Sequence, residues 1–156
     1  MQGKPLSAYL AFQWPFLALI VAVGLLRLGL SLAGVGDQSV RWASMNVVLW
    51  AATIYSGVAA YRRRFGGYRQ LLPLVFVQLV PFHAIAVLGI LLAIGGYPNV
   101  FSAPEFSPPF AGPNNQWLHV LAHLTIGMIV PTLLLWGVAS LAFRITKAAA
   151  PRLGAA

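Results

Sequence analysis

Three histidines are the residues of this chain whose type and spacing could do chemistry. His119 and His123 are four residues apart, so on a helix their side chains lie on one face. His83 lies in a separate apolar stretch, two residues after Pro81. A neutral imidazole is the commonest metal ligand and has no charge to desolvate in an apolar site. His83, His119 and His123 are therefore the candidate cofactor and metal ligands.

Two bound groups suit these histidines. In the first, His83 and either His119 or His123 are the axial ligands of a haem b, and Arg27 or Arg41 contacts a haem propionate. In the second, the three imidazoles hold a single Zn, Cu or Fe ion, because nitrogen donors suit these metals. Binding of either a haem or a metal ion would indicate a function in electron transfer or metal handling within a membrane.

The same histidines can also have a purely structural role. Hydrogen bonds from His, Asn and Gln between membrane helices are ordinary packing interactions, worth about 0.6 kcal/mol on average. Zinc-protease chemistry is not indicated, because Val120 follows His119 where a catalytic Glu would be needed. The chain has only two acids, Asp37 and Glu105, and both lie between apolar stretches, so a proton pump is not indicated either. We expect no catalytic activity of the chain's own.

The amino-acid composition indicates the environment in which the histidines lie. Hydrophobic residues make up 60% of the 156 residues and charged residues 8%, against roughly 45–50% and about 25% in soluble domains. A small soluble domain cannot bury such an excess of apolar surface. The net charge of +8 would suggest nucleic acid in a soluble protein, but the basic residues lie between apolar stretches. We therefore predict a lipid bilayer as the partner, and no nucleic acid.

Four stretches have the length of about 20 apolar residues that a transmembrane helix needs. They cover approximately residues 14–36, 42–61, 71–96 and 117–143, with a Pro-rich loop at 97–116 and an N-cap at Asn114 or Asn115 for the last span. Backbone groups in lipid must be paired within the segment, so each span must be a helix. The sequence predicts one all-α domain over residues 1–156, an integral membrane four-helix bundle.

The distribution of Lys and Arg predicts the orientation of the spans. One side of the predicted topology carries most of the basic residues, namely Lys4, Arg62, Arg63, Arg64, Arg69, Arg144, Lys147 and Arg152. The other side carries Arg41. Both termini are therefore predicted to be cytoplasmic, in a multi-pass protein of the cell (cytoplasmic or inner) membrane. The first apolar stretch is longer than the 7–15 residues of a signal-peptide core, so we expect a retained anchor.

Polar residues within the spans complete the set of candidates. Arg27 lies well inside the first span, where its side chain either extends to the membrane interface or pairs with an anion, Glu105 or an acidic ligand group. Gln13, Asn46 and Gln78 are expected to tie helices together.

The leading hypothesis from the sequence is a small membrane protein that binds haem or a metal ion near the outer leaflet. The alternatives are a non-catalytic accessory subunit of a larger membrane complex, and a small transporter that works as a homo-oligomer.

Overall fold

The computed structural model describes residues 4–103 and 115–153, with side chains up to residue 150. Its elements are α1 (Leu6–Leu32), α2 (Asp37–Val40), α3 (Met45–Arg62), α4 (Tyr68–Ile94), the 3₁₀ helix η1 (Val100–Ser102), α5 (Gln116–Leu124) and α6 (Ile126–Leu153). These described residues contain no strand. Four of their helical segments are long and apolar enough to cross a membrane, which confirms the predicted all-α four-helix fold.

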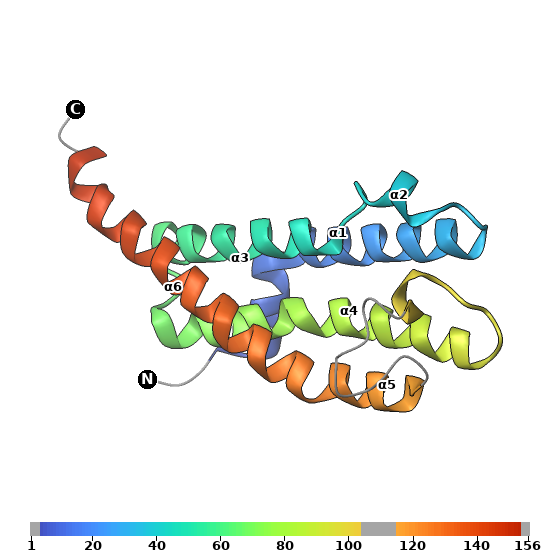
Figure 1. Ribbon diagram of the computed structural model, residues 1–156. Coiled ribbons are helices and arrows are strands. Elements are labelled where there is room, and N and C mark those ends of the chain that lie inside the picture. The colour runs from blue at the N-terminus through green and yellow to red at the C-terminus, as the bar shows by residue number, and fades with distance from the viewer. Residues whose placement is uncertain (1–3, 104–114, 154–156) are drawn as a thin grey trace.

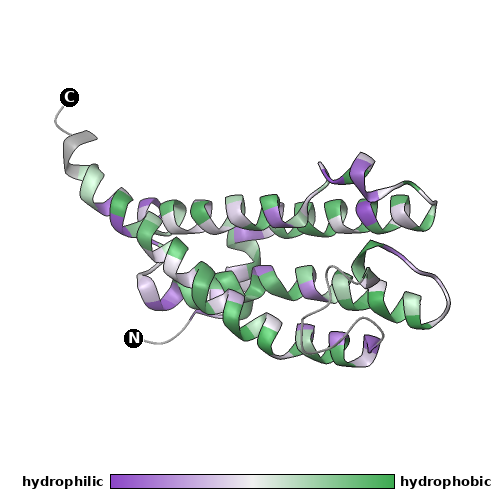
Figure 2. Cartoon of the chain, viewed as in Figure 1, coloured by the Kyte–Doolittle hydropathy of each residue, from purple (hydrophilic) through white to green (hydrophobic). Residues whose placement is uncertain are grey.

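The long helices lie side by side along one axis, and α6 ends at the end of the bundle at which α1 begins (Figure 1). We call this the basic end, because the loop that begins at Arg62 lies there, and we call the opposite end, which carries α2 and η1, the distal end. Apolar residues dominate the helices, and polar residues gather near their ends (Figure 2). That the basic end faces the cytoplasm remains a prediction from the distribution of Lys and Arg.

The first two spans begin and end at different residues from those predicted. Helix α1 begins at Leu6, directly after Pro5, and ends at Leu32, where the sequence predicted residues 14–36. Gly34 follows with a φ of +80°, a conformation that glycine adopts without strain and that ends the helix. Part of the predicted turn is the short helix α2, so the second span is α3, preceded by this extra turn of helix at the distal end.

The fourth span is broken, where the sequence predicted one continuous helix over residues 117–143. Thr125 separates α5 from α6 with backbone angles φ −119° and ψ −94°. Its hydroxyl donates to the carbonyl of Leu121 at 2.7 Å, so the break keeps a local hydrogen bond in place of a helical one. The side chain of Asn115 accepts from the N–H of Leu118 at 3.0 Å, which confirms the predicted N-cap. Asn114 lies outside the described residues.

A buried hydrogen-bond network joins α1, α3 and α4. Gln78 Nε2 donates to Gln13 Oε1 at 2.8 Å and to Ser56 Oγ at 2.9 Å, and Thr53 Oγ1 donates to Gln78 Oε1 at 3.2 Å. Gln13 Nε2 donates in turn to the carbonyl of Leu74 at 3.1 Å. All four side chains are fully buried. The predicted role of Gln13 and Gln78 in tying helices together is confirmed.

Helices α3 and α6 pack closely at Gly57. A Cβ atom at this position would collide with the carbonyl oxygen of Ala139 and would lie 2.8 Å from Cβ of Ala142. Small residues allow such close backbone approach between membrane helices. Glycine at this position therefore sets the spacing of α3 and α6.

Candidate functional site

His83 on α4 and His123 on α5 meet across the helix interface. Their Nδ1 atoms lie 2.8 Å apart, with ring centroids 5.1 Å apart. One Nδ1–H donates to the other Nδ1, and which ring donates depends on the tautomers. The side chain of His83 is 5% exposed. The two helices therefore hold this pair of imidazoles in direct contact.

His119 extends the pair to a row of three imidazoles. It lies one turn before His123, and the two rings stack with centroids 5.0 Å apart and an interplanar angle of 28°. His119 is 1% exposed. The three histidines singled out from the sequence thus lie in one cluster. Within residues 4–103 and 115–150, however, no group of three or more His, Asp or Glu side chains is arranged to hold a metal ion.

Gly127, just after the break in the fourth span, leaves room for His83. A Cβ atom there would lie 3.2 Å from Cε1 of His83 and 2.9 Å from the carbonyl oxygen of Ala122. The break and the glycine together let the His83 ring lie against the junction of α5 and α6.

The short distance between His83 and His123 decides whether a haem or a single metal ion fits between them. A haem would have to place its macrocycle between its two axial nitrogens, and two Nδ1 atoms at 2.8 Å leave no space for it. A haem does not fit between this pair as it is arranged. Zn–N bonds of about 2.0–2.1 Å in tetrahedral geometry put two ligand nitrogens ~3.3 Å apart, so a metal ion would need only a small separation of the rings.

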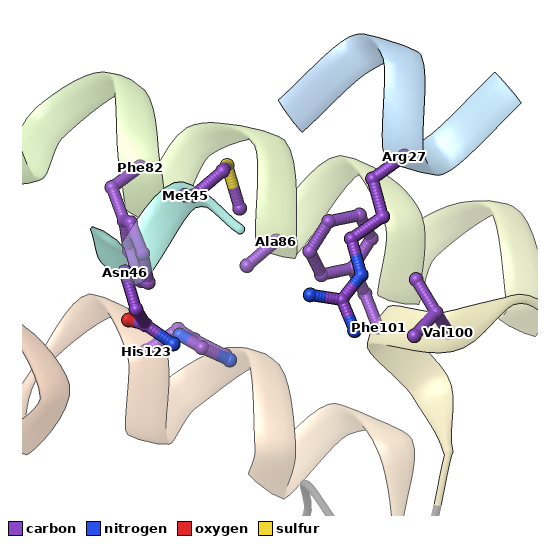
Figure 3. Close-up of a pocket in the computed structure, with 8 residues that line it drawn as sticks. All are labelled: Arg27, Met45, Asn46, Phe82, Ala86, Val100, Phe101 and His123. Carbon is purple, nitrogen blue, oxygen red and sulfur yellow. The ribbon is translucent and has the colours of Figure 1, made fainter. Parts of the chain in front are cut away.

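A cavity of about 170 Å³ lies beside the histidine cluster, toward the distal end. Residues from α1, α3, α4, η1 and α5 line it: Arg27, Met45, Asn46, Phe82, Ala86, Val100, Phe101 and His123. In Figure 3, His123 and Asn46 both lie toward one end of the cavity, and the guanidinium of Arg27 points into the space from the other. The cavity thus brings together two of the site residues singled out from the sequence, Arg27 and His123.

Arg27 pairs with Asp37 on α2. Its Nη2 atom lies 2.6 Å from Asp37 Oδ1, and the two side chains are 14% and 43% exposed. Its Nε atom is buried and has no hydrogen-bond partner among the described residues. Sequence reasoning offered Glu105 or an acidic ligand group as the anion and missed Asp37, because the pairing requires α2 to fold back over α1. Glu105 lies outside the described residues.

Phe101 is a second residue that sequence reasoning did not assign to the site. Asn99 holds it there, accepting from the N–H of Phe101 at 3.1 Å and donating through Nδ2 to the carbonyl of Gly89 at 2.7 Å. A Cβ atom at Gly89 would lie 2.7 Å from the Phe101 ring, so the glycine lets η1 approach α4. Arg41, the alternative propionate partner, is exposed and does not line the cavity.

No protein-family model, no curated protein and no solved structure matches this chain.

Proposed function

We propose that this multi-pass membrane protein binds a small molecule in the cavity between Arg27 and His123. The observation that carries the proposal is the convergence of a guanidinium from α1, an amide from α3 (Asn46) and an imidazole from α5 on one cavity. Ligand sites are typically concave and mostly apolar, with a few convergent polar groups that orient the ligand. Met45, Phe82 and the other apolar lining residues supply the walls.

The size of the cavity limits the ligand. An apolar cavity of about 150 Å³ is large enough to hold benzene, and this one is about 170 Å³. A ligand whose enclosed part is a single six-membered ring would fill it. The polar groups at both ends would then fix the orientation of the ring. Binding, rather than a reaction, is the function that this set of donors and apolar walls supports.

Filling the cavity tests the proposal. Ala86 is a buried lining residue, and Ala86→Leu adds three carbon atoms inside the cavity. Ala51→Leu is the matched control, because Ala51 is exposed on α3 and does not line the cavity. The measurement is the thermal unfolding of detergent-purified protein with a panel of single-ring compounds.

A ligand at about 100 times its Kd stabilises the native state by about 2.7 kcal/mol, a rise of several degrees in Tm. We expect this rise for at least one compound in the unaltered protein and in Ala51→Leu, and its loss in Ala86→Leu. A panel without effect, or an equal effect in Ala86→Leu, would contradict the proposal. Should Ala86→Leu not fold, Asn46→Leu at the exposed rim tests the same cavity.

Metal binding by the histidine cluster is a second candidate function, for metal handling or electron transfer. The observation that favours it is the 2.8 Å approach of the Nδ1 atoms of His83 and His123. Elemental analysis of the purified protein should then find about one Zn, Cu or Fe ion per chain, lost in His123→Ala. An absorption spectrum tests haem through its Soret band. A colourless, metal-free preparation that co-purifies with other membrane proteins would favour the accessory-subunit alternative.

A further inference from the structure

We infer that the cavity ligand is a ring compound with a carboxylate at one end and a second polar group at the opposite end of the ring. In this inference the side chain of Asp37 competes with the ligand carboxylate for binding to Arg27. This inference rests on the proposed function, and it adds the chemical class of the ligand. Three observations carry it: the partner that Arg27 already has, the donor that this partner leaves unused, and the polar groups at the far end of the cavity.

The partner of Arg27 shows which group this guanidinium accepts. A charged side chain inside a membrane span is costly unless it is paired. Arg27 is paired with a carboxylate, at 2.6 Å from Asp37 Oδ1. Asp37 is 43% exposed and belongs to α2, a helix of only four residues at the distal surface. A carboxylate can therefore take the place of Asp37, whose side chain would turn into water.

The unused donor favours a ligand carboxylate over Asp37. Only Nη2 of Arg27 contacts Asp37, and Nε is buried without a hydrogen-bond partner in the described part of the chain. A buried donor that lacks a partner costs about 1–3 kcal/mol. A carboxylate that enters from the cavity can accept from Nε and Nη2 together, the bidentate arrangement that arginine favours. The exchange of one carboxylate for another leaves the local charge unchanged.

The end of the cavity opposite Arg27 can form hydrogen bonds with a second polar group of the ligand. His123 and Asn46 both line this end of the cavity (Figure 3), and both side chains can donate or accept a hydrogen bond. In Figure 3, Ala86 lies between this end and Arg27, and the ring of Phe82 lies at the Asn46 end. None of the eight lining residues is acidic. A ring with a carboxylate at one end and a hydroxyl at the other satisfies both ends, and 4-hydroxybenzoate is the simplest such probe.

Calorimetric titration of the full-length protein in detergent with 4-hydroxybenzoate tests the inference. We expect Asp37→Asn to bind the probe about tenfold more tightly, because the competing carboxylate is gone. Arg27→Gln should bind it at least about tenfold more weakly. Arg41→Gln is the matched control, since Arg41 is an exposed arginine next to the same distal surface and should leave the affinity unchanged.

Two further probes define the chemical class. The neutral 4-hydroxybenzamide should bind about tenfold more weakly than the carboxylate. Octanoate carries the carboxylate of a membrane fatty acid. If octanoate binds more tightly than 4-hydroxybenzoate, the site is one for an acyl chain, and the inference of a ring-containing ligand is wrong. Unchanged or weaker binding of 4-hydroxybenzoate to Asp37→Asn would show that Asp37 does not compete with the ligand for Arg27. Neither the comparison of probes nor Asp37→Asn requires the Arg27 variant to fold.

The outcomes separate this inference from the proposed function. Equal binding of the neutral amide and the carboxylate, both lost in Ala86→Leu, would leave the cavity as the binding site and overturn its preference for a carboxylate. Absence of binding for every ring compound in the unaltered protein would overturn both.

Discussion

The Nδ1 atoms of His83 and His123 lie 2.8 Å apart although 40 residues separate them in the chain. The contact holds α4 against α5 just before the break at Thr125, and it places the His123 ring at the edge of the cavity that Arg27 enters from the other side. Packing between helices and the shape of the candidate site therefore depend on the same imidazole pair.

Removal of either histidine of the pair should destabilise the protein. In His83→Ala, Nδ1 of the mostly buried His123 loses its partner, and a buried polar atom left unpaired costs about 1–3 kcal/mol. The two single variants and the double variant form a cycle, measured by unfolding in mixed detergent micelles. We expect a coupling free energy of about 0.6 to 1.7 kcal/mol, the range for hydrogen bonds between membrane helices. Strictly additive effects would show that the contact contributes nothing to stability.

Gln78→Leu should also lower the free energy of unfolding. Gln78 contacts Gln13, Thr53 and Ser56, all fully buried, so its loss leaves several polar atoms unpaired at about 1–3 kcal/mol each. Gln38→Leu, at an exposed position on α2, makes the same chemical change without touching the network. Equal stability of the two variants in the same micelle assay would mean that the network is not a source of stability.

Glycine-to-alanine changes at two positions should have opposite signs. At Gly57 the new methyl group meets the carbonyl oxygen of Ala139, and overpacking of this kind costs about 1–3 kcal/mol. At Gly29 on α1 nothing lies within 4 Å of the new methyl group, and alanine favours the helix by about 0.5–1 kcal/mol. Thermal unfolding should show a lower Tm for Gly57→Ala and an unchanged or higher Tm for Gly29→Ala. A tolerated Gly57→Ala would refute the close α3–α6 approach.

The orientation in the membrane can be tested without background, because the chain contains no cysteine. Ser39→Cys places a thiol on α2 at the distal end, and Ala148→Cys places one on α6 at the basic end; both positions are exposed. The excess of Lys and Arg at the basic end predicts that an impermeant maleimide labels only Ser39→Cys in intact cells. Labelling of Ala148→Cys instead would reverse the predicted orientation.

The sequence predicts the four-helix fold because four apolar stretches of membrane-spanning length leave few alternatives. It does not predict the break at Thr125, because the residues there are apolar or threonine and carry no helix-ending signal, while the contact of Gly127 with His83 joins two distant helices. The histidines could be identified because titratable groups inside apolar spans are rare. The Arg27–Asp37 pair could not, because it depends on how α2 folds back. Phe101 could not be assigned either, because its place at the cavity depends on hydrogen bonds of Asn99 and on the close approach at Gly89.

The central claim, a ligand held between Arg27 and His123, is tested most directly by a crystal structure of the protein with 4-iodobenzoate, in which anomalous scattering locates the iodine. We expect the iodine at the His123 and Asn46 end of the cavity and the carboxylate on Arg27, with Asp37 displaced. Iodine only on lipid-facing surfaces, with the cavity closed by its own side chains, would contradict the account.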